Sequence, residues 1–240
     1  MAARWSVTRA LLWIFAISAF IGTLLGLVLG LDLVAHPPDI PDTVDLPGRL
    51  EAIRPYLEAR WPLDLATNLA AIVAFGALAL LADPLAALAG SDDRAGLLRV
   101  SIIVSAVLAL AGALIYVGAT RVTIDQAYCD CGFKTEESIS QFWAISIIQG
   151  ATDWLSHGSS VFAAIALVAA GSLIRRRGLP PSWRWLAWAG ALALIVGMVL
   201  GEVVDGPIGD LVSAAATGIL LPVWALMLAV RLDRLDPAEG

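Results

Sequence analysis

The sequence predicts an all-α fold, a polytopic transmembrane helical bundle with six spans, and its composition is the first reason. Of the 240 residues, 59% are hydrophobic and 15% are charged, whereas a soluble domain carries about 25% charged residues. So few polar groups would not cover the surface of a soluble protein of this size, and so many apolar groups exclude a disordered chain. The second reason is that the chain contains six apolar runs, each near the length of about 20 residues that crosses a bilayer.

The spans are expected at about residues 10–31, 63–83, 98–120, 153–174, 184–204 and 209–231, within a single membrane domain that covers residues 1–240. The first run is longer than the apolar core of a signal peptide, and no clear small-residue cleavage site follows it, so we expect it to remain a span. In the sixth, Pro222 is expected to kink the helix, because proline removes a backbone hydrogen bond.

The distribution of positive charge predicts an N-in/C-in topology. With the N-terminus inside, the inner segments hold ten arginines, including the run Arg175 to Arg177, and the outer segments hold five Arg or Lys residues. An even number of spans agrees with both termini on one side. Arginine outnumbers lysine 14 to 1, which is typical of a GC-rich bacterial genome. We therefore expect a multi-pass protein of the bacterial inner (plasma) membrane.

The first outer loop is expected at residues 32–62 and carries an amphipathic pattern. Leu50, Ile53, Leu57 and Trp61 share roughly one helical face. This pattern is typical of a short helix that rests on the outer leaflet. The alternative is a docking element for a membrane protein partner.

The second outer loop is expected at residues 121–152 and contains two features of interest. Its apolar stretch from Ser138 to Thr152 is too short to span, so it either extends the fourth helix above the membrane or forms a re-entrant or surface segment. Cys129 and Cys131 lie on the side that is oxidising in bacteria. A disulfide between them would be strained and easily reduced. A plain structural disulfide, a disulfide to a partner and a soft copper site are the alternatives.

Small residues recur every fourth position in the first span, at Gly22, Gly26 and Gly30. Such a stripe forms a flat face on which another helix can approach closely. We expect this face to pack within the chain. The alternative is a homo-oligomer, or a complex with another membrane protein, that assembles through the same glycines.

The candidate site consists of five polar residues near the outer ends of the spans: Asp64, Asn68, Asp153, His157 and Glu202. Counted from the inner ends of their spans, Asp64, His157 and Glu202 lie at about the same height, roughly 27–28 Å. Asp153 and His157 are four residues apart, as are Asp64 and Asn68, so each pair shares a helix face. If these faces turn inward, they form a polar vestibule that opens outward. The alternative is that they only mark the wet ends of the helices.

Several functions lack the residues they need. No HExxH, GxSxG, Walker or GxGxxG motif occurs, so no catalytic residue is assigned. A transition-metal site normally needs three or four ligands, and with two histidines and two cysteines we expect neither metal nor cofactor. The longest basic run has three residues, so the chain has no nucleic-acid footprint, and its expected surroundings are the lipid bilayer.

The C-terminal half has a recognisable order of elements. A helix with a polar head, from Asp153 to Ile174, leads to a short basic loop with proline, from Arg175 to Pro181, and two further helices follow that close at Arg231. This layout resembles a family of uncharacterised six-span bacterial membrane proteins, classed as a domain of unknown function. The resemblance implies a fold and a location, and it implies no activity.

These features favour a non-enzymatic membrane protein that binds a small molecule or lipid, acts as a sensor, or serves as an accessory subunit. An ion-coupled small transporter is the first alternative, although no internal repeat is visible and no carboxylate lies at the midplane. The second alternative is an intramembrane acid-catalysed enzyme of the prenyl cyclase type. In that enzyme Asp64 and Glu202 would act as proton donor and acceptor.

Overall fold

The computed structural model is an all-α bundle with six spans, and it describes residues 2–41, 46–90, 93–128, 136–173, 179–204 and 208–232. The first five spans lie in single helices: α1 (Ala2–Gly30), α2 (Leu46–Ala89), α3 (Asp93–Tyr128), α4 (Glu136–Leu173) and α5 (Pro181–Val203). The sixth is divided into α6 (Ile208–Ala215), the π-helix η2 (Ala216–Leu220) and α7 (Leu221–Arg231). Each span is long and apolar enough to cross a membrane, which confirms the predicted fold class.

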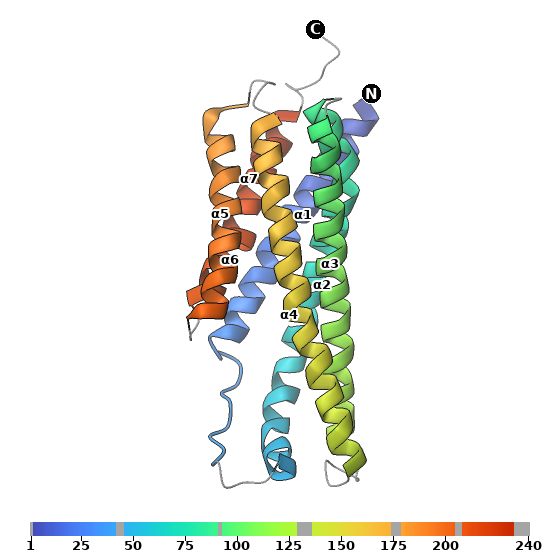
Figure 1. Ribbon diagram of the computed structural model, residues 1–240, viewed down its shortest axis with the longest axis vertical. Helices are drawn as coiled ribbons and strands as arrows, with labels where there is room; N and C mark the ends of the chain where they lie inside the picture. Colours follow the sequence, from blue (N-terminus) through green and yellow to red (C-terminus); the bar gives the residue numbers. More distant parts are fainter. Residues whose placement is uncertain are drawn as a thin grey trace.

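The helices form a closed ring in chain order. Each span packs against the next, and the sixth span returns to pack against α1 through η2 and α7. The start of α1 and the end of α7 lie at the same end of the bundle, which we call the terminal end (Figure 1). The opposite, distal end carries the start of α2, the end of α3 and the start of α4. The ring therefore encloses an interior, which side chains fill at some depths and leave hollow at others.

Three helices are much longer than a bilayer requires. α2, α3 and α4 contain 44, 36 and 38 residues, or roughly 66, 54 and 57 Å, whereas the hydrocarbon core is about 30 Å thick. At the distal end they project beyond α1, α5 and α6 (Figure 1).

Both segments expected as outer loops are therefore largely helical. α2 runs without a break through the stretch expected as a helix on the leaflet, with Pro55 and Pro62 inside it. α4 begins at Glu136, so the stretch from Ser138 to Thr152 extends the fourth helix. It does not form the re-entrant or surface segment that was the alternative. The physical reason is packing, because α3 contacts both α2 and α4 and tertiary contacts stabilise helices more than propensity does.

The packed core lies toward the terminal end. Its largest fully buried apolar side chains come from every span except α4: Leu12, Leu81, Leu85, Leu88, Leu98, Trp183, Leu228 and Leu232. Trp183 stacks on Trp224 with ring centroids 4.9 Å apart, and its indole N–H donates to the Trp224 carbonyl at 3.2 Å. Close packing of this kind excludes water. The ring is therefore closed at its terminal end.

The irregularity expected at Pro222 is a π-helical turn. Proline has no N–H to donate to the carbonyl of Gly218, and the backbone N–H of Leu221 instead bonds the Ala216 carbonyl five residues back. Gly218 lies in this turn directly against Thr23 of α1, so that a Cβ on Gly218 would overlap the threonine side chain. The π-turn is thus the place where the last span meets the first.

The glycine stripe of α1 faces the neighbouring helix of the same chain. A Cβ on Gly22 would lie 3.3 Å from the Cβ of Ala70, and one on Gly26 would lie 3.8 Å from Cγ2 of Thr67. Gly30 has open space at this position. Packing within the chain is thus the observed use of Gly22 and Gly26, and assembly through this stripe stays a prediction.

Candidate functional site

A cavity of about 630 Å³ occupies the distal half of the ring. Side chains of α1, α2, α4, α5 and the sixth span line it, and no described side chain of α3 does. The packed core lies on its terminal side, so the cavity lies in the half that the sequence predicted to be polar. Its lining changes in character with depth, from charged side chains to hydroxyls to apolar groups.

Three ionisable residues of the described lining lie at the mouth of the cavity: Asp153, His157 and Glu202. Asp153 and His157 lie one turn apart on α4, and Glu202 lies at the end of α5. Nε2 of His157 lies 3.4 Å from Oε1 of Glu202. The Glu202 side chain is 56% exposed and that of His157 is 23% exposed, so the pair spans the opening from its wet rim to its inner wall.

Hydroxyl groups line the middle of the cavity. They come from four of its five walls: Ser18, Thr23, Thr67, Ser156, Ser159, Ser160, Ser213 and Thr217. Thr67 donates to the Leu63 carbonyl at 2.8 Å and Thr217 to that of Ser213 at 2.9 Å. A hydroxyl that donates to its own helix keeps oxygen lone pairs that accept. The middle zone therefore offers acceptors to a polar ligand or to water.

The floor of the cavity is apolar. Its side chains include Phe15, Phe75, Leu78, Leu194 and Leu221. Leu194 lies two turns from Glu202 along α5, or roughly 12 Å. Within that distance the wall changes from charged to apolar. A single molecule that filled the cavity would therefore need a polar end and an apolar end.

The structure brings together three of the five predicted vestibule residues. Asp153, His157 and Glu202 line one cavity, whereas Asp64 and Asn68 are not among its lining residues. Nδ2 of Asn68 donates to the backbone carbonyl of Asp64 at 2.8 Å, so their i, i+4 spacing is used within α2. The ion-pair partner of His157 is Glu202 from another helix. The expected Asp153–His157 contact does not form an ion pair.

The remaining candidates fall elsewhere. Cys129 and Cys131 lie outside the described residues, so their pairing stays a prediction. Within the described ranges, no group of three or more His, Cys, Asp or Glu side chains could hold a metal ion.

Sequence reasoning missed most of the hydroxyl lining, although one signal was present. Asp153, Ser156, His157 and Ser160 follow the i, i+3, i+4, i+7 spacing of one helix face. Reading the stripe as a whole would have added Ser156 and Ser160 to the site. Ser18 and Thr23 of α1 carried no comparable signal, because their spacing does not repeat.

The indole of Trp154 indicates how deep in the membrane the mouth of the cavity lies. Its side chain is 74% exposed, and its ring meets that of His157 edge to face, with centroids 5.7 Å apart. Tryptophan concentrates at the boundary between hydrocarbon and water. The mouth therefore lies near the distal membrane surface.

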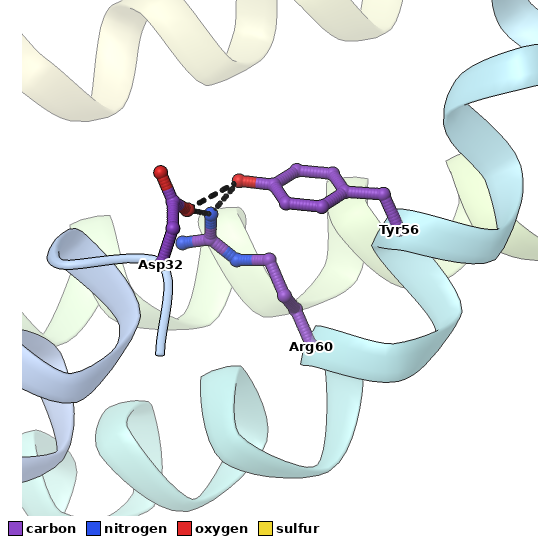
Figure 2. A network of polar contacts seen from close by, with 3 residues as sticks. All are labelled: Asp32, Tyr56 and Arg60. Atoms are coloured by element: carbon purple, nitrogen blue, oxygen red, sulfur yellow. Dashed lines mark hydrogen bonds and ion pairs between the residues drawn. The ribbon is translucent and has the colours of Figure 1, made fainter. Parts of the chain in front are cut away.

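A polar network at the end of α1 connects two walls of the cavity (Figure 2). Oδ1 of Asp32 accepts from Tyr56 at 3.0 Å and from Arg60 at 3.1 Å. Arg60 also contacts the Tyr56 hydroxyl, and its guanidinium lies 4.9 Å from the centre of the Tyr56 ring. Because Tyr56 and Arg60 are on α2, the network holds the end of α1 against the extension of α2.

No family model, curated protein or solved structure matches this chain. Only the geometry and chemistry of the site itself therefore indicate its function.

Proposed function

We propose that this protein is a non-enzymatic integral membrane protein of the bacterial inner membrane that binds a small amphiphilic molecule. It would act as a binding protein, a sensor or an accessory subunit. The observation that carries the proposal is the cavity itself, with ionisable groups at its mouth and apolar side chains at its floor. Its volume of about 630 Å³ lies within the range of roughly 300–1,000 Å³ that is usual for ligand sites.

The charge at the mouth limits the chemistry of the ligand. Among the described lining residues, two carboxylates, Asp153 and Glu202, lie at the mouth with one imidazole, His157. Carboxylates form their strongest hydrogen bonds with charged donors such as ammonium groups. The proposed ligand therefore carries a cationic or donor-rich head at the mouth, and its apolar part points toward Phe15 and Leu78.

The proposal can be tested with a medium-chain alkylamine as the probe and the matching alkyl carboxylate as its charge-reversed control. A ligand that binds only the folded state raises the thermal unfolding temperature. We expect the amine to stabilise the wild-type protein in nanodiscs and the carboxylate not to do so. Glu202→Gln should weaken the effect of the amine roughly tenfold in concentration, because a charge-assisted contact is lost.

The control for this experiment is His36→Gln, since His36 lies outside the cavity lining. His157→Gln should change the stabilisation by the amine, because the imidazole contacts Glu202 at the mouth, and His36→Gln should leave it unchanged. Equal stabilisation by the amine and the carboxylate, or equal responses of the two histidine variants, would rule out the proposed site.

The transporter alternative would need a path through the terminal end of the ring. Leu12, Leu81 and Leu228 are fully buried there, so substrate passage would require the packed core to open. The charged mouth also lies near the distal surface rather than at the midplane where transporter sites usually lie. Uptake of the alkylamine into proteoliposomes would favour the transporter over the binding protein.

The enzyme alternative paired Asp64 with Glu202 as proton donor and acceptor. Only Glu202 lines the cavity, so the two carboxyl groups do not face one another across it. The geometry therefore favours binding over acid catalysis.

A further inference from the structure

A second hollow lies on the outside of the ring, in its terminal half, where α3, α4 and α5 face the membrane. Its volume is about 680 Å³, and it shares no lining residue with the cavity inside the ring. Most of its wall is apolar and includes Leu97, Val161, Ile165, Val168, Leu192 and Ile195. Leu97 and Leu192 are exposed on the surface of the chain, so the hollow is a groove open toward lipid.

The polar residues of this groove gather at its terminal end. Arg94 lies in the first turn of α3, Ser172 in the last turn of α4, and Trp188 two turns into α5. Arg94 forms no ion pair with any residue that the structure describes. The groove thus combines an apolar channel with a cation that has no ion-pair partner among the described residues.

A second arginine stands beside the same end. The Arg184 guanidinium lies 5.0 Å from the centre of the Trp188 ring. Its Nε is buried and finds no acceptor among the described residues, and the same is true of the Trp188 indole nitrogen. Both nitrogens are enclosed by protein, so what Arg184 contributes at this end of the groove is the positive charge of its guanidinium.

The dimensions of the groove match one leaflet. From Ser172 to Val161 its α4 wall covers 12 residues, or 11 helical steps of roughly 16 Å in all. Half of a hydrocarbon core of about 30 Å is about 15 Å. An acyl chain could therefore lie along the groove while its headgroup reaches the level of the two arginines.

We propose that this groove binds an anionic phospholipid from the leaflet at the terminal end. One acyl chain lies between α4 and α5, and the phosphate contacts Arg94, with Arg184 beside it. The occupant is anionic because the cations have no carboxylate partner among the described residues, and arginine binds phosphate oxygens through two parallel hydrogen bonds. Basic residues between membrane helices are a known way to hold such headgroups. This site is separate from the proposed ligand cavity.

The test uses the full-length protein, stripped of lipid in a mild detergent and titrated with phosphatidylglycerol or phosphatidylcholine. Native mass spectrometry reads the occupancy. We expect a preference for phosphatidylglycerol, and Arg94→Gln should weaken its binding roughly tenfold, as expected for one charge-assisted contact. The matched control is Arg99→Gln, because Arg99 does not line the groove and pairs with Asp83 at 2.6 Å.

Two further measurements test the proposal even if Arg94→Gln folds poorly. Val168→Trp fills the groove from an exposed position and should weaken both lipids. Glycerol phosphate, which has a headgroup and no chain, should not compete at concentrations where phosphatidylglycerol binds. Equal binding of the two lipids, equal effects of the two arginine variants, unaltered binding in Val168→Trp or full competition by glycerol phosphate would each overturn it.

Discussion

At the scale of single residues, the most informative position is Asp32, where the chain leaves α1. Its φ of 51° is in the left-handed region, which glycine usually occupies at helix ends. The N–H of Asp32 bonds the Leu29 carbonyl at 3.0 Å and that of Leu33 bonds the Val28 carbonyl at 3.2 Å. This pair of bonds is the Schellman motif. Aspartate thus stands at a position that usually favours glycine, and its carboxylate binds Tyr56 and Arg60.

Substitutions at Asp32 should separate two contributions to the free energy of unfolding: the strain of the left-handed backbone and the contacts of the carboxylate with Tyr56 and Arg60. Asn tolerates the left-handed conformation and loses only the charge, whereas Ala loses the network and pays the steric cost. We expect Asp32→Asn to destabilise the protein by about 1 kcal/mol and Asp32→Ala by about 2–3 kcal/mol. Thermal unfolding in detergent measures the order, with Asp39→Asn in the exposed loop as control. If Asn and Ala were equally destabilising, the backbone argument would be wrong.

At the scale of elements, the closest approaches between helices involve glycines outside the stripe of α1. Gly218 in the π-turn contacts Thr23, and Gly209 of α6 lies directly against Gly201 of α5. The glycine stripe of α1 makes looser contacts with α2, through Gly22 and Gly26. The tightest helix crossings therefore occur around the sixth span, where the ring closes.

Gly218→Ala should weaken this closure. The added Cβ would overlap the Thr23 side chain, and overpacking of a well-packed site costs about 1–3 kcal/mol. Gly76→Ala in α2 is the matched control, because a Cβ there meets nothing within 4 Å and alanine favours a helix by up to about 1 kcal/mol. We expect the unfolding temperature to fall for Gly218→Ala and to stay level or rise for Gly76→Ala. Similar changes in both would contradict the close contact with α1.

At the scale of the whole molecule, the ring divides the bundle into a packed terminal half and a hollow distal half. The three long helices project on the distal side (Figure 1), which the positive-inside pattern places outside the cell. With this orientation, the cavity would open toward the outer side of the membrane and draw its ligand from there. This assignment rests on orientation, which the charge bias predicts.

Cysteine labelling tests the orientation. In a background with Cys129 and Cys131 replaced by serine, Asp39→Cys lies in the distal loop and Asp93→Cys at the start of α3 on the terminal end. Both positions are exposed. A membrane-impermeant maleimide added to intact cells should label only the first. Labelling of Asp93→Cys alone would show that the orientation is the reverse of the predicted one. Labelling of both positions would contradict a single fixed orientation.

The sequence by itself determined the fold class, the number of spans and the helix face that carries Asp153 and His157. These are local properties, because span length and helical periodicity depend only on neighbouring residues. Only the tertiary structure decided that Glu202 meets His157, that Asp64 does not line the cavity, and that α2 and α4 continue beyond the bilayer. The rotation of each helix about its axis depends on which side chains of distant spans interlock. That packing joins residues far apart in the chain, and periodicity within one helix contains no record of it.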